Sequence, residues 1–423
     1  MCAAKATGLK WLAGLWLLAS VLAGEAAGAT VRQQAEAGFA AWREALWAEA
    51  RAAGISRKTF DSVLGKVTID WSLPDLEPPG GKAQAEKKPS QQAEFGSPGR
   101  YFSESNISIL VARGRAERDK RRKELLAIER RYGVPHQILL AIWGRETAHG
   151  TVKIPHDAIR SLTTQAYIGR RAAFFREQLI AALKLVEGGH GSRADLRSSW
   201  AGAMGHTQML PTHILQYGVD FDGDGRRNVW GSVSDALAAT ANFLAKNGWQ
   251  GGLPWGYEVT PPKGADCTLE GPHQGRPFAE WVALGYERTR GRKFPPGRLA
   301  TIGHLLMPAG RYGPAFLVTG NFYVLKEYNE SDLYALYVGH LADRFDNDRR
   351  FEGRWGNVAT YARSEVMALQ NVLVGQGYNV GDTVDGLIGF RTRIAVGNYQ
   401  RKSGLTVDCW PGPETLKQAR RQG

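Results

Sequence analysis

The sequence predicts an α+β fold that is predominantly α. Apolar residues recur at helical spacing over residues 30–70 and again from Ile109 to Val186, whereas residues 249–322 combine Gly- and Pro-rich turns with short apolar runs typical of strands. Helical periodicity returns at Asp332–Phe345. With 423 residues, 43% of them hydrophobic, the chain is long enough to bury the cores of more than one domain.

The first residues have the order of a secretory signal peptide. Lys5 and Lys10 precede an apolar run from Trp11 to Leu22, and the small residues Ala26–Ala29 follow. We therefore predict a signal peptide at residues 1–29 and export to the periplasm. The apolar run of about twelve residues is shorter than the roughly 20 that a bilayer requires, so we expect no transmembrane anchor in the mature chain. The cleavage region contains no cysteine, which argues against a lipobox.

Charge and cysteine content restrict the partners and the covalent chemistry. The 54 Lys and Arg residues outnumber the 41 Asp and Glu residues, so the formal charge is +13 and an anionic partner is expected: nucleic acid, anionic lipid or an acidic wall polymer. Export favours the wall polymer, and no nucleic-acid-binding signature is present, so we expect no nucleic acid partner. Cys2 would leave with the signal peptide. Cys267 and Cys409 could pair, but the sequence does not show that they meet.

Two helical stretches and a low-complexity segment are predicted in the N-terminal half. Residues 30–70 are predicted to be helical, because Phe39, Trp42, Leu46 and Trp47 recur at helical spacing. Residues 78–100 begin with Pro-Pro-Gly-Gly and continue with Lys, Gln, Glu and Ser, the composition of a disordered insertion or surface loop. A later helix at Ala172–Val186 is expected to bury one stripe, formed by Phe174, Leu179, Ala182, Leu183 and Val186.

A short helix is predicted from Pro135 to about His149 and carries a candidate catalytic acid. Its apolar side is formed by Ile138, Leu139 and Ile142. Glu146 follows Ile142 by one helical turn, so its carboxyl projects from the same side. Desolvation raises the pKa of such a carboxyl, as a general acid near neutral pH requires. The alternative is a surface ion pair between Arg145 and Glu146 at a helix end.

A second informative block runs from Ser199 to Pro211. Its small residues and glycines allow the backbone to approach a ligand or another segment closely, and Gln208 offers a donor and an acceptor for sugar hydroxyl or acetamido groups. Ser199 could hydrogen-bond a carboxyl. The alternative is tight helix packing in which Gln208 serves as a capping or core amide.

An acidic loop has the pattern of an EF-hand calcium loop. Carboxylates stand at its positions 1, 3 and 5, Gly at position 6 and a polar residue at position 9. These carboxylates and the polar residue are Asp220, Asp222, Asp224 and Asn228. Gly231 occupies position 12, where a bidentate Glu is expected, so the site would need Asp235 from the following helix. An acidic turn held by side-chain to backbone hydrogen bonds is the alternative.

The motifs together resemble a known enzyme family. Glu146 on its helix, the Ala-Gly-Ala-Met-Gly-x-x-Gln-x-x-Pro block and the segment Asn321–Asn329 resemble the lytic murein transglycosylases of the B type, glycoside hydrolase family 103, from about Gly38 to Arg344. The resemblance implies a lysozyme-like α-rich domain with a small α/β lobe at residues 30–346. It implies cleavage of the β-1,4 bond between N-acetylmuramic acid and N-acetylglucosamine with formation of a 1,6-anhydro product. Peptidoglycan glycan strands would be the partner, with other cell-wall enzymes as further candidates.

The resemblance also assigns roles to matched residues. Glu146 matches the single acid that then acts as base, Ser199 a serine that orients it and Gln208 a substrate-binding glutamine. Tyr328 and Asn329 match a pair that lines the cleft. No cofactor is required for this chemistry, because intramolecular attack replaces a second carboxylate.

Two further assignments depend on the resemblance alone. Arg170 and Arg171 match a paired arginine that contacts the peptide or lactyl carboxylate side of the substrate, and an ordinary basic helix start is the alternative. Arg226 matches the position of a structural Ca²⁺ loop that contributes its carbonyl oxygen.

The C-terminal segment Val366–Leu416 carries spaced motifs that include Leu-Gln-x-x-Leu, Asp-Gly-x-x-Gly-x-x-Thr-Arg and Tyr-Gln-x-x-x-Gly-Leu. They resemble the small three-helix peptidoglycan-binding module of wall enzymes and imply such a domain at residues 359–421, after a linker at 347–358. Asp408-Cys409 stands where these modules usually have Asp-Gly, so a different local turn is expected. The module would raise the effective substrate concentration. A stabilising helical appendage is the alternative.

Three functions remain open at this point: a lytic transglycosylase, a hydrolytic muramidase of similar shape, and a wall-binding protein without activity. A hydrolase would need a second carboxylate across the cleft. The sequence also leaves open endo or exo cleavage, the preference for stem peptides, calcium binding and the oligomeric state.

Overall fold

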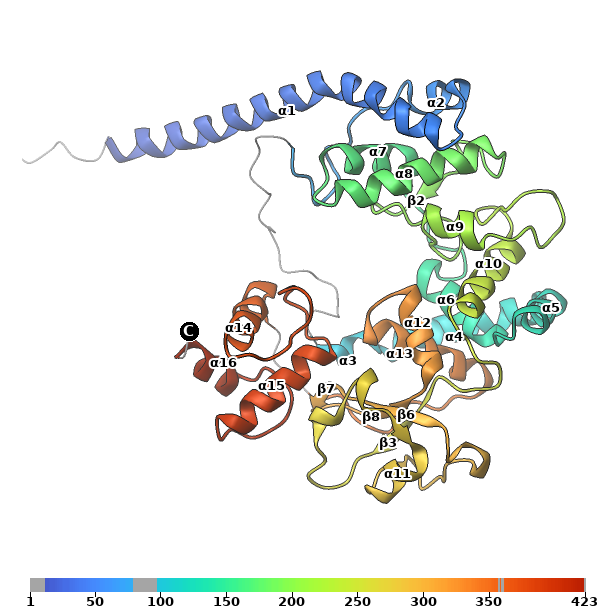
Figure 1. Ribbon diagram of the computed structural model, residues 1–423, viewed down its shortest axis with the longest axis vertical. Coiled ribbons are helices and arrows are strands. Elements are labelled where there is room, and N and C mark those ends of the chain that lie inside the picture. The colour runs from blue at the N-terminus through green and yellow to red at the C-terminus, as the bar shows by residue number, and fades with distance from the viewer. Residues whose placement is uncertain (1–11, 79–96, 357, 359–360, 422–423) are drawn as a thin grey trace, which may run out of the picture. The chain divides into compact units, whose positions relative to one another are not determined.

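The computed structural model describes residues 12–78, 97–356, 358 and 361–421, with side chains from Val31 onward (Figure 1). Most of the predicted low-complexity segment 78–100 and the first part of the predicted signal peptide therefore lie outside the described residues. The chain divides into two compact units. The first comprises Met1–Ala85, Ile154–Gln216 and Gly223–Gly231, and the second comprises Glu86–Lys153, Tyr217–Asp222 and Ser232–Gly423.

The first unit is built from helices and one two-stranded ladder. Its elements are α1 (Leu12–Ala52), α2 (Arg57–Leu64), β1 (His156–Asp157), α7 (Ala158–Ile168), α8 (Ala172–Glu187), β2 (Arg197–Ser198) and the beginning of α9 (Pro211–Tyr217). The left-handed Gly54 ends α1, and Ser56 caps α2 by accepting from the Thr59 amide. The predicted helix over residues 30–70 is therefore two helices, and the prediction is wrong beyond Leu64.

The buried side of α8 differs from the predicted stripe at both ends. Phe174 and Val186 are only half-buried, whereas Phe175 and Leu185 are buried. The buried side faces α7, which packs along α8. Phe174 and Phe175 are adjacent and equally hydrophobic, so the spacing of apolar residues alone does not determine which of the two lies on the buried side of α8.

Helices surround the candidate acid in the second unit. They are α3 (Pro98–Tyr101), α4 (Glu104–Lys120), α5 (Arg122–Tyr132), α6 (His136–Thr147), α10 (Val233–Lys246), α12 (Gly320–Tyr328) and α13 (Asp332–Asp346). The left-handed Gly133 ends α5, and α6 begins directly after Pro135, where the sequence predicted a helix to start. Helix α6 packs against α4, α5, α10 and α13 (Figure 1). It is therefore the central helix of this cluster.

An antiparallel sheet follows in the region where mixed structure was predicted. Its strand order is β4-β6-β8-β3-β5, and Leu317 is opposite both Tyr257 and Leu305. The elements are β3 (Gly256–Thr260), η2 (Cys267–Leu269), η3 (Pro272–Gln274), β4 (Arg276–Pro277), α11 (Phe278–Ala283), β5 (Glu287–Arg288), η4 (Pro296–Arg298), β6 (Ile302–Leu306), β7 (Pro308–Arg311) and β8 (Ala315–Val318). Its core includes Phe278, Trp281 and Phe294.

The C-terminal segment forms α14 (Arg363–Gly375), α15 (Phe390–Lys402) and α16 (Pro413–Arg420), coloured orange to red in Figure 1. They enclose a small core of their own, which includes Leu369, Leu373, Val396 and Tyr399. We refer to residues 361–421 as the C-terminal module. The prediction of a predominantly α fold with a small sheet and a three-helix C-terminal part is confirmed.

The segment predicted as a linker packs against the second unit. Phe351 lies 3.9 Å from His340 between ring centroids, and Trp355 stacks on Phe102 at 5.0 Å. A Cβ atom at Gly99 would lie 2.7 Å from Trp355, so the two backbones approach closely there. Residues 351 and 355 therefore belong to the folded unit.

None of the described helices combines the length and the apolar character that crossing a membrane would require.

Candidate active site

Glu146 lies in the last turn of α6, on the side that the sequence predicted. Ile138, Leu139 and Ile142 are buried in the second unit, and the Glu146 carboxyl is half-buried beside them. Because the helix is surrounded by other helices, its last turn presents this carboxyl to protein as much as to solvent. Burial raises the pKa of Glu146 to about 6.

A tyrosine from a distant part of the chain holds this carboxyl. The Tyr334 hydroxyl, near the start of α13, donates to Glu146 Oε1 at 2.6 Å. Tyr334 is itself buried, and burial together with the Glu146 charge raises its own pKa well above the ordinary value. The hydroxyl therefore remains a donor, and its hydrogen bond lowers the pKa of Glu146 in opposition to burial. The two effects leave the acid poised between protonated and charged forms near neutral pH.

Arg145 does not form the surface pair that was considered for Glu146. Its Nε and Nη2 donate to the Tyr101 hydroxyl at 3.1 and 2.8 Å, and its guanidinium lies over the Tyr101 and Tyr337 rings. Arg145 and Glu146 thus have different hydrogen-bond partners. The arginine acts on the carboxyl at longer range, where its charge lowers the pKa of Glu146.

The backbone immediately after Glu146 is held in an unusual conformation. Ala148 and His149 both have positive φ, 48° and 59°. His149 folds back so that Nε2 donates to the Leu140 carbonyl, and its ring lies where a Cβ atom at Gly144 would be 2.7 Å away. Burial lowers the pKa of His149 to about 4, so the ring is neutral. Non-glycine residues in this region cost energy and persist only where the surroundings enforce them, which fixes where α6 ends.

Tyr328 and Asn329 lie at the turn between α12 and α13. Tyr328 packs edge-on against Phe243 at 5.2 Å and lies close enough to Tyr334 to act on it electrostatically. Asn329 is exposed, and its Oδ1 accepts from the Ser331 amide at 3.1 Å. The structure therefore brings Tyr328 near the pair of Tyr334 and Glu146, with Asn329 on the same turn.

The block from Ser199 to Pro211 belongs to the first unit and forms tight turns. Residues 199–210 contain no helix, although Gln208 is bonded to the backbone as the alternative interpretation expected. The Ser199 hydroxyl accepts from the Ala203 amide at 3.2 Å, and Gln208 donates from Nε2 to the Gly205 carbonyl at 2.9 Å. Gly205 has positive φ, and a Cβ there would lie 2.4 Å from the Val229 carbonyl oxygen. Glycine is therefore required for close backbone approach, as the sequence suggested.

Gln208 is strained within this block. Its φ of 54° places a non-glycine residue in the left-handed region. The half-buried amide is pinned by its bond to Gly205 rather than free to rotate. Strain of this kind is characteristic of functional positions.

Arg170 and Arg171 precede α8 and are both exposed. Arg170 forms an ion pair with Asp75 at 3.2 Å, and Arg171 lies over the Phe174 and Phe175 rings at 5.1 and 5.2 Å. This arrangement matches the description of a basic helix start. It leaves the guanidinium groups accessible to a ligand.

The acidic loop gathers carboxylates around the start of α10. In the second unit, carboxylate oxygens of Asp220, Asp222 and the buried Asp235 lie within 4.8 Å of one another, and Asp224, next along the same loop, belongs to this group. Asp235 accepts from the Phe221 amide at 2.8 Å. It therefore stands where the missing residue at position 12 was needed.

The other predicted ligands shape the loop. Asp224 accepts from the Arg226 amide at 2.8 Å, and Asn228 accepts from the Gly231 amide at 2.8 Å. These are the turn-forming hydrogen bonds of the alternative interpretation. They occur together with the grouped carboxylates, so the two descriptions do not exclude each other.

Sequence reasoning missed Tyr334. The residue was included in a predicted helix, but its partner lies 188 residues earlier in the chain. The one available signal was that a tyrosine inside an apolar helix needs a partner for its hydroxyl. That signal does not identify the partner.

Comparison with known families and proteins gives consistent matches. The transglycosylase SLT domain family matches residues 38–343, and the peptidoglycan binding domain family matches residues 362–418. The membrane-bound lytic murein transglycosylase B of Escherichia coli (strain K12) is 31% identical over 225 residues, which are 50% of this chain and 56% of that protein. This chain thus matches little more than half the length of that relative.

Solved structures extend the similarity to nearly the whole chain. SltB3 from Pseudomonas aeruginosa, in complex with NAG-NAM-pentapeptide, is 38% identical and has a TM-score of 0.81, covering 90% of this chain and 99% of that one. Its complex with NAG-anhNAM-pentapeptide gives 0.79. The Escherichia coli lytic transglycosylase Slt35, solved in complex with calcium, is 27% identical with a TM-score of 0.51 over 60% of this chain and 80% of that one. The expected lysozyme-like transglycosylase fold is confirmed.

The raised pKa of Glu146 predicts a specific pH dependence of stability. The folded state holds its proton up to a pH of about 6, whereas the ordinary value is 4.5, so the unfolded state ionises first and stability falls as pH rises between these values. Glu146→Gln keeps an acceptor for Tyr334 and cannot ionise. We expect the variant to be more stable than the wild type by about 1–2 kcal/mol at pH 7 and equally stable at pH 4. Denaturant unfolding at both pH values measures this, and a difference independent of pH would contradict it.

Proposed function

Because the chain belongs to the transglycosylase SLT domain family, we propose that it is an exported lytic transglycosylase of peptidoglycan. It cleaves the β-1,4 bond between N-acetylmuramic acid and N-acetylglucosamine and leaves a 1,6-anhydro ring on the muramoyl product. The observation that carries this proposal is the half-buried Glu146, whose pKa is raised to about 6 and whose Oε1 accepts from Tyr334. A carboxyl in this condition can give a proton at neutral pH and take one back.

In the first step Glu146 acts as general acid. Tyr334 occupies Oε1, so Oε2 carries the proton toward the glycosidic oxygen. The proton moves to that oxygen as its bond to C1 of the muramoyl sugar breaks, and the glucosaminyl alcohol leaves. Glu146 becomes a carboxylate, which the Tyr334 hydrogen bond and the charge of Arg145 stabilise.

In the second step the same carboxylate acts as base. It takes the proton from the 6-hydroxyl of the muramoyl sugar while that oxygen bonds to C1 and closes the anhydro ring. Glu146 is then protonated again, so one residue returns to its starting state within a cycle. The attacking hydroxyl belongs to the substrate, and its high effective molarity removes the need for a second carboxylate that activates water.

Other residues receive substrate-binding roles on the basis of their motifs. Gln208, held in place by Gly205, would bind the glycan, and Ser199 would help to orient the acid. Tyr328 and Asn329 project from the turn that leads to Tyr334. The exposed Arg170 and Arg171 would meet anionic groups of the stem peptide or lactyl side.

The acidic loop has the chemistry of a structural calcium site. Asp220, Asp222, Asp224 and Asp235 supply carboxylate oxygens, which are the ligands that Ca²⁺ prefers. A cation would offset the mutual repulsion of these negative charges, one of which is buried. The carbonyl of Arg226 and the side chain of Asn228 would complete the set. The calcium complex of Slt35 supports this assignment.

The remaining assignments concern location and wall binding. The signal-peptide pattern at residues 1–29 supports export to the periplasm. Peptidoglycan strands are the proposed partner of both the catalytic unit and the C-terminal module, since residues 362–418 match a peptidoglycan binding domain. The formal charge of +13 suits an anionic polymer. Other cell-wall enzymes are candidate further partners.

The reaction is tested by mass spectrometry of the muropeptides released from purified sacculi. We expect the wild type to release products one water lighter than hydrolytic products, and Glu146→Gln to lower the rate by at least about 100-fold because the acid is lost. Glu258→Gln is the matched control. Glu258 is also half-buried with a pKa raised by burial, but it binds the backbone amides of Glu352 and Gly353. This control should keep wild-type activity.

Other outcomes of this experiment would replace the proposal. Hydrated reducing-end products from the wild type would identify a hydrolytic muramidase. Binding to sacculi without release by any variant would identify a wall-binding protein.

The calcium site is tested by thermal and denaturant unfolding. Ca²⁺ at about 100 times its dissociation constant should stabilise the wild type by about 3 kcal/mol, and a chelator should remove this gain. Asp222→Asn should abolish most of the effect. Asp382→Asn, which alters an almost fully exposed carboxylate, removes the same charge and should leave the response intact. An equal response in both variants would show that Ca²⁺ acts elsewhere.

A further inference from the structure

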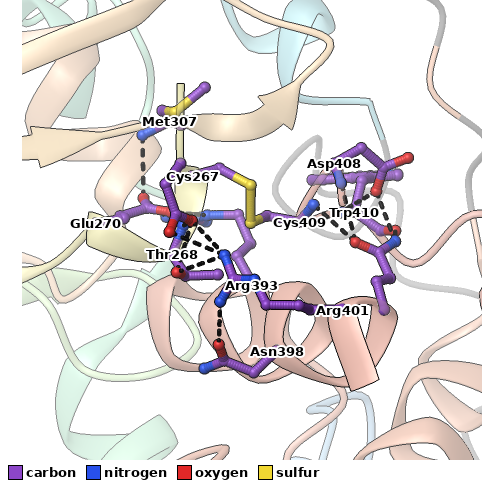
Figure 2. The surroundings of a disulfide bond; sticks show 12 residues. Cys267, Thr268, Glu270, Met307, Arg393, Asn398, Arg401, Asp408, Cys409 and Trp410 are labelled. Carbon is purple, nitrogen blue, oxygen red and sulfur yellow. Dashed lines mark hydrogen bonds and ion pairs between the residues drawn. A yellow bond between two sulfur atoms is a disulfide. The ribbon is translucent and has the colours of Figure 1, made fainter. Parts of the chain in front are cut away.

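The C-terminal module is joined to the rest of the second unit by more than its linker. Cys267 at η2 and Cys409 after α15 form a disulfide with 6.1 Å between their Cα atoms, and both are buried (Figure 2). Helix α15 packs against η2. A Cβ atom at Gly397 would lie 2.5 Å from the Cys409 sulfur and 2.6 Å from a Thr268 side-chain carbon. The α15 backbone at Gly397 therefore packs directly against the disulfide and the Thr268 side chain of η2.

A buried charge cluster lies in the same interface. Arg393 of α15 donates from Nε to Glu270 at 3.0 Å, from Nη2 to both Glu270 and Asp332, the latter at 2.9 Å, and from Nη1 to the Ile388 carbonyl at 2.8 Å. Lys326 lies 2.6 Å from the other oxygen of Asp332. The side chains of Arg393, Glu270 and Asp332 are only 2%, 0% and 9% exposed. Two cations thus balance two anions away from water.

This charge cluster includes the first residue of α13, the helix whose Tyr334 donates a hydrogen bond to the candidate acid. Asp332 begins α13, and Tyr334, two residues later, donates to Glu146. The turn before Asp332 carries Tyr328 and Asn329. Burial opposes ionisation of Asp332, but Lys326 and Arg393 outweigh it and lower its pKa, so Asp332 is charged. A single guanidinium of the C-terminal module therefore holds the start of the helix on which Tyr334 lies.

We propose that Arg393 is a positioning residue for Glu146. By binding Asp332, Arg393 fixes the α12–α13 turn and the beginning of α13, and thereby the direction from which the Tyr334 hydroxyl reaches the acid. The C-terminal module then supports the catalytic geometry in addition to any binding of the wall. This inference rests on the proposed function of Glu146, although its effect on that carboxyl can be measured without any reaction.

The interface supplies a matched control. Arg401, also on α15, donates to both carboxylate oxygens of Asp266 at 2.8 Å, and these side chains are 50% and 39% exposed. This ion pair also joins the C-terminal module to the segment that leads into η2. Asp266 precedes η2 rather than α13, so loss of the pair removes an interface contact without reaching the Tyr334 helix.

The experiment compares Arg393→Met, Arg393→Lys and Arg401→Gln in the full chain with the disulfide intact. The substrate is a soluble glycan fragment of a few disaccharides, so that kcat does not depend on binding to sacculi. We expect Arg393→Met to lower kcat about 10- to 100-fold with KM nearly unchanged, because the acid is misoriented. Loss of the Tyr334 hydrogen bond raises the pKa of Glu146, so the fall of kcat/KM at high pH should move to higher pH. Arg401→Gln should match the wild type.

The conservative variant keeps the test informative if Arg393→Met does not fold. Lysine retains the charge but not the forked donor geometry, so Arg393→Lys should restore part of kcat and shift the pH profile in the same direction by less. Thermal unfolding verifies that each variant is folded. A folded Arg393 variant with lower kcat and an unchanged pH profile would overturn the proposal. Wild-type kcat and a wild-type pH profile in both Arg393→Met and Arg393→Lys would overturn it as well.

A second readout separates this inference from the proposed function. NMR titration of the ¹³C-labelled Glu146 carboxyl should give a higher pKa in Arg393→Met than in Arg401→Gln, whether or not the chain cleaves peptidoglycan. Equal values in the two variants would overturn the positioning role. By contrast, an active Glu146→Gln enzyme would refute the proposed function and leave this comparison standing.

Discussion

The hydrogen bond between Tyr334 and Glu146 is the interaction on which the rest of the site depends. Burial at the end of α6 raises the pKa of the carboxyl, whereas the Tyr334 hydroxyl and, after it, the Arg145 charge lower it, so the value of about 6 is the balance of these opposed effects. That balance requires α6 to end at a fixed residue, which His149 enforces by folding back onto Gly144. It also requires α13 to begin at a fixed place. The first condition is local in the chain, whereas the second is not.

The non-local condition connects catalysis with the C-terminal module. In a tethered arrangement a binding module changes only the local concentration of substrate. Here the disulfide, the close approach at Gly397 and the neutral cluster around Arg393 place the module against both η2 and the start of α13. Breaking a buried ion cluster leaves an uncompensated charge, so such clusters tend to fix one arrangement. The module is thus part of the folded unit that contains Glu146.

The sequence predicted what depends on local spacing. The placement of Glu146 on the buried side of α6 followed from one helical turn after Ile142, and the mixed region after residue 249 became the sheet. Local pattern failed where neighbouring residues were equivalent, as at Phe174 and Phe175. It also could not identify pairs far apart in the chain. Tyr334 and Glu146, or the two cysteines separated by 142 residues, meet only through tertiary packing, which leaves no periodic signal.

The most direct test of this account is the titration of Glu146 itself, by ¹³C NMR of the labelled carboxyl in the wild type and in Tyr334→Phe. The phenylalanine keeps the ring and removes only the donated hydrogen bond. The account predicts a pKa of about 6 in the wild type and a higher value in the variant, because only the Arg145 charge then opposes the effect of burial. A wild-type value near the ordinary 4.5, unchanged in the variant, would contradict it.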